Sequence, residues 1–305
     1  NRPHHRRMQP AVHHLLAAGG GLATTKQLLT VMTRQQLDVQ VRNGGLSRVW
    51  HGIYAATEPD LSGRLRALDL FMGTEAVACL GTAARLHGFD LENTTAVHVF
   101  DPGVRVRPTV GLMVHQRTGA PIQRIAGRLA TTAAWTAIEV ARQLPRPRAL
   151  ATLDAALHSA CCTPAELARA ADEQHGRRGI VAVRELLQYA DGRAESAMES
   201  ESRLVMIDRG LPLPELQYEI VSRDGEVYRV DFAWPDAMLV AEYESVDWHA
   251  GRAELLRDRK RLAAIQELGW ILVPIVTSDV RQHPDRLASR LALHLAEPPS
   301  RRRLA

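Results

Sequence analysis

Lysine is almost missing from this 305-residue sequence, in which Lys26 and Lys260 are the only lysines among 38 basic Lys and Arg residues. The positive charge therefore comes from arginine, whose planar guanidinium pairs bidentately with phosphate and with guanine. A formal net charge of +4 favours an acidic partner such as nucleic acid, but a GC-rich coding bias explains the arginine content equally well. Charge alone raises the expectation of a nucleic-acid partner only modestly.

Cysteines, aromatic residues and long apolar runs are also scarce. Cys79, Cys161 and Cys162 form no CxxC pair and have no spaced histidines of zinc type, which predicts reduced thiols and a cytoplasmic location. No apolar run reaches the length of a membrane span, and the basic start has no apolar signal-peptide core, so no membrane partner is expected. With 46% hydrophobic and 24% charged residues, the chain predicts a globular protein of two or three domains.

Two capping boxes follow a short helix near the N-terminus. The helix at 10–18 is stopped by glycines, and then Thr24 with Gln27 and Thr33 with Gln36 each have the spacing that opens a helix. After two glycines, residues 46–56 alternate in polarity like a small hairpin. Helix, helix, helix and hairpin is the order of a winged helix-turn-helix.

The second capped helix has an apolar face and a polar face. Leu37 and Val41 lie on the first face at i,i+4. A winged helix places the start of this helix at base edges and its hairpin near phosphates. A small helical cap with a merely solvated polar face is the alternative. The candidate DNA-binding residues are Thr33, Arg34, Gln35, Asp38, Arg42, Arg48 and His51.

The middle region, 61–192, is rich in Ala and Leu and predicts a helical scaffold with one β-hairpin. The hairpin strands are 96–100 and 111–117. His87, His98 and His115 occur here without ligand spacing, so they are interpreted as surface or satisfied core histidines.

From residue 193 the pattern changes to helix, three strands, helix and strand. A turn of two or four residues around Pro235 and Asp236 sets Asp231 opposite Val240 or Glu242, and in both cases Asp231 and Glu242 share a face. Such neighbours lie about 5–8 Å apart. Glu244 shares this face too. The acids predict a Mg²⁺ or Mn²⁺ site, with a solvated strand surface paired to Arg229, Arg259 or Arg261 as the alternative.

This order of elements, with acids on the helix and the second and third strands, resembles the PD-(D/E)XK nucleases. More narrowly, residues 195–295 are similar to the very-short-patch-repair-like endonuclease domain of bacteria. The resemblance implies that Asp231 and Glu242 bind the metal, that Glu199 is the helix acid and that His249 is the general base. Asp236 lies in the turn and is not assigned the catalytic role.

Two positions depart from the family pattern. Glu244 stands where the superfamily has Lys, and Ser245 stands where the narrower family has Gly, so the resemblance implies the fold more directly than the activity. Lys260, Arg259 and Gln217 are the candidates to supply the missing polar group.

The N-terminal part has a resemblance of its own. Residues 11–90, with TTKQLLTVMTRQQLDVQVRNGGLSRVWHGIYA and EAVACLGTAARLHGF, are similar to AbiEi-type antitoxins of abortive-infection systems. This resemblance implies DNA binding through the second helix and the wing, with autoregulation of an operon.

The fold class predicted is therefore α/β, or α+β overall. Its parts are a winged helix-turn-helix at 1–60, a mostly helical region at 61–192, a nuclease-like domain at 193–296 and a basic tail at 297–305. The first hypothesis for function is a Mg²⁺-dependent endonuclease that acts on double-stranded DNA. The second is a non-catalytic DNA-binding regulator or antitoxin with a degenerate nuclease fold, whose partner is a toxin or a second copy of the chain. A third, action on RNA, is disfavoured because aromatic residues make up only 5% of the chain.

Overall fold

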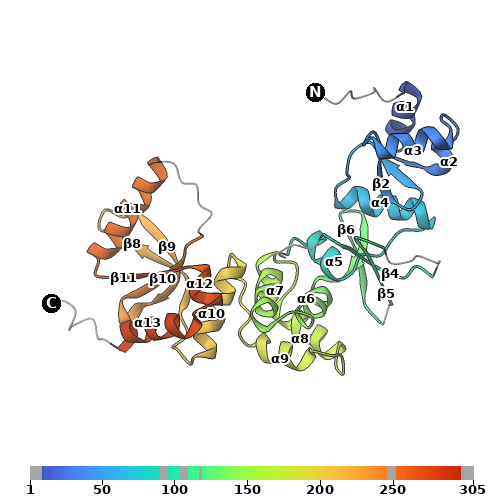
Figure 1. The fold of residues 1–305 in the computed structure, drawn as a ribbon. Helices are drawn as coiled ribbons and strands as arrows, with labels where there is room; N and C mark the ends of the chain where they lie inside the picture. The colour runs from blue at the N-terminus through green and yellow to red at the C-terminus, as the bar shows by residue number, and fades with distance from the viewer. Residues whose placement is uncertain (1–8, 90–94, 104–108, 117–118, 246–251, 297–305) are drawn as a thin grey trace. The chain divides into compact units, whose positions relative to one another are not determined.

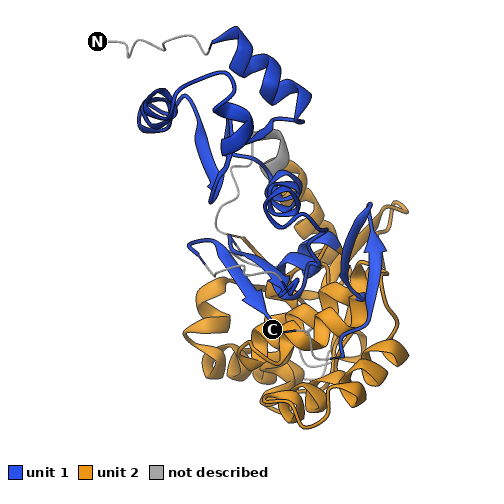
Figure 2. Cartoon of the chain, turned by 90° about the vertical axis from the view of Figure 1, so that its right-hand side faces the viewer, with its two compact units in different colours: residues 1–86, 91–132 blue, residues 87–90, 133–305 orange. Residues whose placement is uncertain are grey.

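The computed structural model describes residues 9–89, 95–103, 109–116, 119–245 and 252–296, with side chains omitted at 252–255. The fold is mixed α/β (Figure 1). The chain forms two compact units, which Figure 2 colours separately. Unit 1 comprises residues 1–86 and 91–132, and unit 2 comprises 87–90 and 133–305. Among the described residues, no helix is both long and apolar enough to cross a membrane.

Unit 1 begins with three helices and a small three-stranded sheet. The strands are ordered β1-β3-β2, with both pairings antiparallel. The elements are α1 (Pro10–Ala18), β1 (Leu22–Thr24), α2 (Thr25–Leu28), α3 (Arg34–Arg42), β2 (Ser47–Trp50) and β3 (Ile53–Ala55). The predicted glycine stop after α1 and the predicted hairpin are confirmed. Strand β1 was not predicted, because its three residues are too few to show a period of two.

One apolar core holds this part of unit 1 together. Leu37 of α3 is fully buried and packs in a cluster with Leu28, Leu46 and Tyr54. The cluster joins side chains from α2, from α3 and from strand β3. Burial of a leucine of this kind contributes about 1.5–3 kcal/mol, so the orientation of α3 on the sheet is fixed by its apolar face.

The rest of unit 1 packs two helices with two strand pairs. Its elements are α4 (Leu61–Met72), α5 (Leu80–Leu86), β4 (Val97–Phe100), β5 (Leu112–His115), β6 (Ile122–Ile125) and β7 (Arg128–Thr131). The strands predicted at 96–100 and 111–117 are present, but the prediction that they form a hairpin is wrong, because β4 and β5 pair in parallel. The hairpin of this region is β6–β7, around Ala126 and Gly127, both at positive φ.

Unit 2 starts with four helices of small apolar residues. They are α6 (Ala133–Ala141), α7 (Arg146–His158), α8 (Pro164–Glu173) and α9 (Ile180–Leu187). Helix α8 begins with Thr163 as its N-cap and Pro164 in its first turn, with a complete capping box to Glu166. Every residue of α6 is buried, as the Ala-rich composition predicted for packing elements.

The C-terminal part of unit 2 is a four-stranded sheet with helices. The elements are α10 (Ala197–Asp208), β8 (Glu215–Val221), β9 (Val227–Trp234), a 3₁₀ turn η1 (Pro235–Ala237), β10 (Leu239–Tyr243), α11 (Arg252–Glu267), β11 (Ile271–Ile275), α12 (Thr277–Arg281) and α13 (Pro284–Ala296). The strand order is β11-β10-β9-β8, and only the β10–β11 pair is parallel. The predicted sequence of helix, three strands, helix and strand is confirmed, with α12 as an addition.

Apolar side chains cover both faces of this sheet. Leu239 and Ala241 belong to one buried cluster, and Val240 belongs to another that includes Ile265 of α11. Because side chains alternate along a strand, Glu242 follows Val240 on the face covered by α11. Helix α11 is therefore the element placed to contact that carboxylate.

Helix α10 is unusual because five of its seven buried residues are polar. Glu201 is 3% exposed and lies 2.9 Å from the guanidinium of Arg281 in α12 and 3.4 Å from that of Arg148 in α7. Arg203 is paired with the buried Asp154 of α7 at 2.7 Å. Buried charges persist only when they are paired, so these ion pairs explain how a polar helix is packed inside unit 2.

Candidate functional site

Helix α3 presents a polar, exposed face. The predicted capping box is present: the Thr33 side chain accepts the Gln36 N–H at 3.2 Å, and the Gln36 carboxamide accepts the Thr33 N–H at 2.8 Å. The exposed side chains of this face include Arg34 and Arg42, which carry its positive charge. The predicted residues on this helix are all exposed, namely Thr33, Arg34, Gln35, Asp38 and Arg42.

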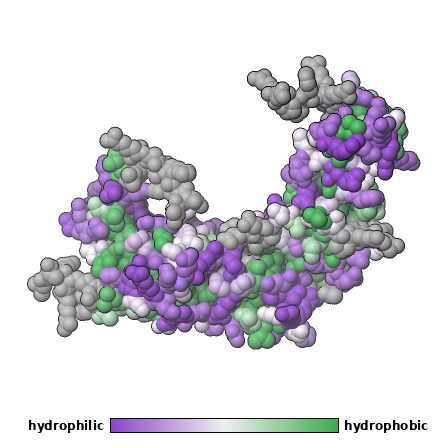
Figure 3. Space-filling model, viewed as in Figure 1, coloured by the Kyte–Doolittle hydropathy of each residue, from purple (hydrophilic) through white to green (hydrophobic). Residues whose placement is uncertain are grey.

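The hairpin β2–β3 carries the two remaining residues predicted to bind DNA. Arg48 of β2 is exposed, and its guanidinium carbon lies 5.6 Å from the centroid of the Tyr54 ring. His51 is exposed at the turn, where Gly52 has a φ of +73°. Space-filling Figure 3 shows mostly hydrophilic residues over α2 and α3 on the side facing the viewer. Exposed cations on a helix face and on a hairpin are what contact with phosphates requires.

The acids of the C-terminal sheet lie on neighbouring strands. Ala241 of β10 pairs with Phe232 of β9, which sets Glu242 across from Asp231 one residue further. The connection between the strands is the four residues 235–238, so the alternative with the longer turn is confirmed. Asp236 is exposed in that turn.

Asp231 is a half-buried carboxyl whose charge is disfavoured. Burial, followed by the negative charge of Glu199 and also that of Glu242, raises its pKa from 3.8 to about 6. The Tyr243 N–H, which donates to the Asp231 carboxylate at 2.9 Å, and the charge of Arg261 act in the opposite direction. Glu199, Asp231 and Glu242 are called the acid cluster below. Within it, the charges of the other two acids both act on Asp231.

Arginine from α11 neutralises the second acid. The Arg261 guanidinium donates to both oxygens of Glu242, with Nη1 to Oε2 at 2.8 Å, and its Nη2 also donates to the Arg229 carbonyl at 2.7 Å. Such bidentate pairs are among the strongest hydrogen bonds in proteins. Arg261 was one of three arginines named as an alternative partner for the acids, and the structure selects it.

Glu199 is held by two donors. Its carboxylate accepts the Glu195 N–H at 2.9 Å and the Gln217 side-chain amide at 3.0 Å. Gln217 lies within β8 but has a φ of +53°, a conformation that costs about 1 kcal/mol or more for a non-glycine residue. The amide of Gln217, one of the three candidates named with Lys260 and Arg259 to supply a polar group, donates to the acid Glu199.

Other predicted residues lie elsewhere. Glu244 follows the end of β10 and is exposed, with its N–H donating to the Ile275 carbonyl at 2.8 Å. Arg259 and Lys260 are exposed on α11. His249 lies outside the described residues.

The acid cluster, as arranged, does not fit Mg²⁺. A magnesium site needs open carboxylate oxygens in near-octahedral geometry, whereas both oxygens of Glu242 accept hydrogen bonds from Arg261. In the part of the chain that is described, no group of three or more His, Cys, Asp or Glu residues is arranged to hold a metal. The cation that faces Glu242 is the guanidinium of Arg261.

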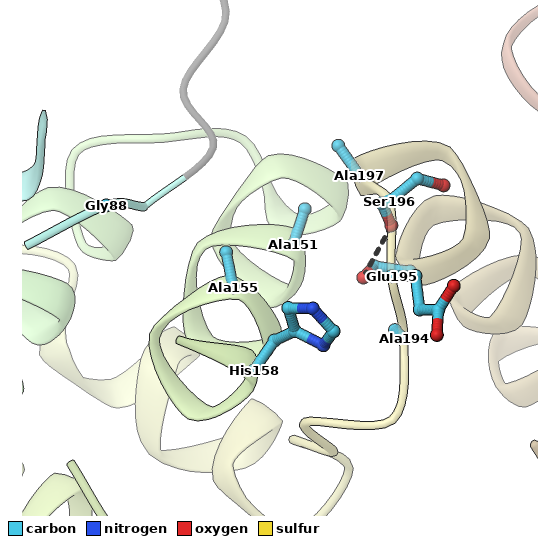
Figure 4. A pocket seen from close by; sticks show the side chains of 9 residues that line it. Gly88, Ala151, Ala155, His158, Ala194, Glu195, Ser196 and Ala197 are labelled. Carbon is cyan, nitrogen blue, oxygen red and sulfur yellow. Dashed lines mark hydrogen bonds between the residues drawn. The ribbon is translucent and has the colours of Figure 1, made fainter. Parts of the chain in front are cut away.

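A small cavity lies beside the N-terminal end of α10. Its volume is about 60 Å³, and His158 and Glu195 stand at its edge (Figure 4). The His158 Nδ1 lies 2.9 Å from the Gly192 carbonyl oxygen. A space of this size holds only a few water molecules, so it does not accommodate a nucleotide.

Sequence reasoning missed one pair of histidines. His98 and His115, interpreted as surface or satisfied core histidines, lie with Nδ1 and Nε2 3.0 Å apart on the paired strands β4 and β5. Burial lowers the pKa of both imidazoles. They are 17 positions apart in the sequence, and their approach depends on the register of β4 on β5, which the sequence pattern did not determine.

Comparison with known proteins finds one family that the central region resembles. Residues 76–189 match the family model of the AbiEi antitoxin C-terminal domain. The match covers β4 to β7 and helices α5 to α9, and so includes parts of both units.

Two relatives from Mycobacterium tuberculosis cover nearly the whole chain. They are uncharacterized proteins MT2308 of strain CDC 1551 / Oshkosh and Rv2248 of strain H37Rv. Each is 72% identical over 264 residues, which is 87% of this chain and 97% of the relative. The chain belongs to the same family as these mycobacterial proteins.

Proposed function

We propose that the protein is a DNA-binding regulator of the antitoxin type. The observation that carries the proposal is the exposed, arginine-bearing face of α3 beside the β2–β3 hairpin. The order of these elements and the sheet order β1-β3-β2 agree with a winged helix-turn-helix at 1–60, in which the second capped helix enters the major groove.

Five of the seven predicted residues contact DNA directly in this proposal. Arg34 and Gln35, at the first turn of α3, reach base edges, because arginine pairs with guanine and glutamine with adenine. Arg42, at the last turn, and Arg48 and His51, on the hairpin, contact phosphates. Affinity then depends on salt, since each neutralised phosphate releases counterions.

The AbiEi match supports the second half of the proposal. A region similar to the C-terminal domain of an antitoxin is the natural candidate to bind a toxin or a second copy of the chain. The protein would then repress its own operon through unit 1 and engage its partner through the matched region.

The test is binding of the full chain to duplex DNA from upstream of its own gene, measured by fluorescence anisotropy against a scrambled duplex of equal length. The proposal expects at least about tenfold tighter binding to the upstream duplex and a negative dependence of log K on log salt concentration. Equal affinity for both duplexes would leave non-specific binding only and contradict a regulator.

A metal-dependent endonuclease is the second candidate function. The observation that favours it is the position of Asp231 across from Glu242, with Glu199 close enough to raise the Asp231 pKa. Perturbed carboxyl groups cluster at active sites. Since the cluster as arranged does not fit Mg²⁺, hydrolysis would require Arg261 to release Glu242.

Mutation of Arg261 removes the partner of Glu242 and so frees its carboxylate. If the cluster belongs to a nuclease, Arg261→Ala protein nicks supercoiled DNA in Mg²⁺ or Mn²⁺, and the added change Asp231→Ala abolishes nicking. An inert Arg261→Ala protein that is folded by circular dichroism would exclude the endonuclease and leave the regulator.

A further inference from the structure

Two histidines of unit 1 stand outside both surfaces described so far. His98 pairs with Met113 in the parallel register of β4 and β5, and His115 is two residues beyond Met113. The two histidines therefore lie on the same face of the strand pair. Their ring planes differ by 11°, their centroids are 5.2 Å apart, and Nδ1 of His98 is 3.0 Å from Nε2 of His115.

The backbone holds both residues in place. The His98 N–H donates to the Thr82 hydroxyl at 2.7 Å, and the His115 carbonyl accepts the Asp101 N–H at 2.7 Å. Both side chains are only partly exposed, which limits their movement. The two nitrogens therefore remain directed toward one another without any rearrangement of the strands.

Their separation is close to that in a metal chelate. Two imidazole nitrogens bound to tetrahedral Zn²⁺ at about 2.0–2.1 Å stand about 3.3 Å apart. The observed 3.0 Å differs by a few tenths of an ångström, which a small rotation of either ring supplies. Burial keeps the pKa of both rings low, and the neutral imidazole is the form that binds metals.

We propose that His98 and His115 form a two-histidine site for a divalent transition-metal ion, with Zn²⁺ as the ion that fits best. Imidazole donors suit Zn²⁺, Cu²⁺ and Ni²⁺ and do not suit Mg²⁺ or Ca²⁺. Water completes the coordination, so the site is an open one. A bound ion replaces the hydrogen bond between the two rings: the ring that donates it carries its proton on its other nitrogen instead, and the ion joins β4 to β5. The site is independent of DNA binding and of the acid cluster.

The test is a Zn²⁺ titration of the metal-free full chain by isothermal calorimetry, in a Cys161→Ser background that removes the exposed thiol. The variants His98→Gln and His115→Gln should each lose one Zn²⁺ site or bind Zn²⁺ there about tenfold more weakly or worse. Loss of a residue that only orients a metal ligand already lowers metal affinity by about tenfold or more. His175→Gln, which alters an exposed histidine, is the matched control and should retain every site.

A second measurement avoids dependence on the folding of variants. In ¹⁵N-labelled protein, Zn²⁺ should shift the ring resonances of His98 Nδ1 and His115 Nε2 together. Unchanged resonances, or an equal number of Zn²⁺ sites in the parent and both histidine variants, would overturn the proposal and leave a neutral hydrogen-bonded pair.

Discussion

At the scale of single residues, the pKa of Asp231 is set by burial and by neighbouring charges. Its carboxyl is half-buried between strands and faces two other acids, and its pKa rises from 3.8 to about 6. A folded-state pKa above the ordinary value means that the contribution of this carboxyl to stability is full below pH 4 and is lost as the pH rises through 6. At neutral pH the ionised Asp231 therefore lowers the free energy of unfolding.

This predicts that Asp231→Asn stabilises unit 2 at high pH. At about 1.4 kcal/mol per pH unit, the change from 3.8 to about 6 corresponds to at most about 3 kcal/mol. Denaturant unfolding should show this gain at pH 8 and little difference near pH 4. Asp236→Asn, in the exposed turn, is the control and should change stability at neither pH. A gain for Asp231→Asn that is equal at both pH values would refute the electrostatic explanation.

The acid residues could be predicted from the sequence, but their neutralisation could not. A period of two and a turn around Pro235 were enough to place Asp231 and Glu242 on one face. The choice of Arg261 depended on the rotation of α11 about its own axis, which places Arg261 rather than Arg259 over the sheet. No local pattern determines that rotation, because it is set by how Ile265 packs.

At the scale of elements, α3 depends on its first turn as much as on its core. Helix α3 has nine residues, and helices of this length are marginal in isolation. The capping box at Thr33 satisfies N–H groups that would otherwise have no partner, and the same turn carries Arg34 and Gln35. Stability and recognition are therefore coupled at this end of the helix.

We expect Thr33→Ala to destabilise unit 1 by about 1 kcal/mol and to weaken DNA binding. The hydroxyl that accepts the Gln36 N–H is removed, so the first turn frays and its side chains lose their fixed orientation. Thermal unfolding and anisotropy titration measure the two effects. Thr74→Ala, at an exposed position, should leave both unchanged. If the Thr33→Ala protein binds DNA with the affinity of the parent, the cap at Thr33 is not needed for DNA recognition.

Elements with strong local signals were predictable, and those set by distant pairing were not. Capping residues and glycines marked α1, α2, α3 and α8 in the sequence. The parallel pairing of β4 with β5 could not be seen, since two strands joined by a short segment are expected to form a hairpin. The register of this strand pair was not determined by the sequence either, so the approach of His98 to His115 was not predicted.

At the scale of the whole molecule, the two compact units do not follow the domain boundary that the sequence pattern suggests at residue 193. The pattern changes at residue 193, yet α10 is tied to α7 by the Arg203–Asp154 pair and to α12 through Glu201. The helices α6–α9 and the C-terminal sheet therefore share one unit. A change in composition marks where helices give way to strands. Which elements form one compact unit depends on tertiary contacts, and these cannot be read from the sequence pattern.

The match to the AbiEi antitoxin C-terminal domain spans residues 76–189, which follow α3 and precede the acid cluster in the sequence. In the proposed regulator, unit 1 supplies DNA contact, the matched region supplies the partner surface, and the acid cluster is an internal ion-pair site. This account requires the α3 face to carry the affinity of the entire chain for DNA.

The most direct measurement is therefore the affinity of full-length variants for the upstream duplex over a range of salt concentrations. Arg34→Ala should cost about 1–3 kcal/mol, and Arg42→Ala should reduce the salt slope by about 1. Arg184→Ala, which alters an arginine paired with the exposed Asp172 in unit 2, is the matched control and should bind like the parent. If both α3 variants bind with the affinity and salt slope of the parent, α3 does not contact DNA and the account is wrong.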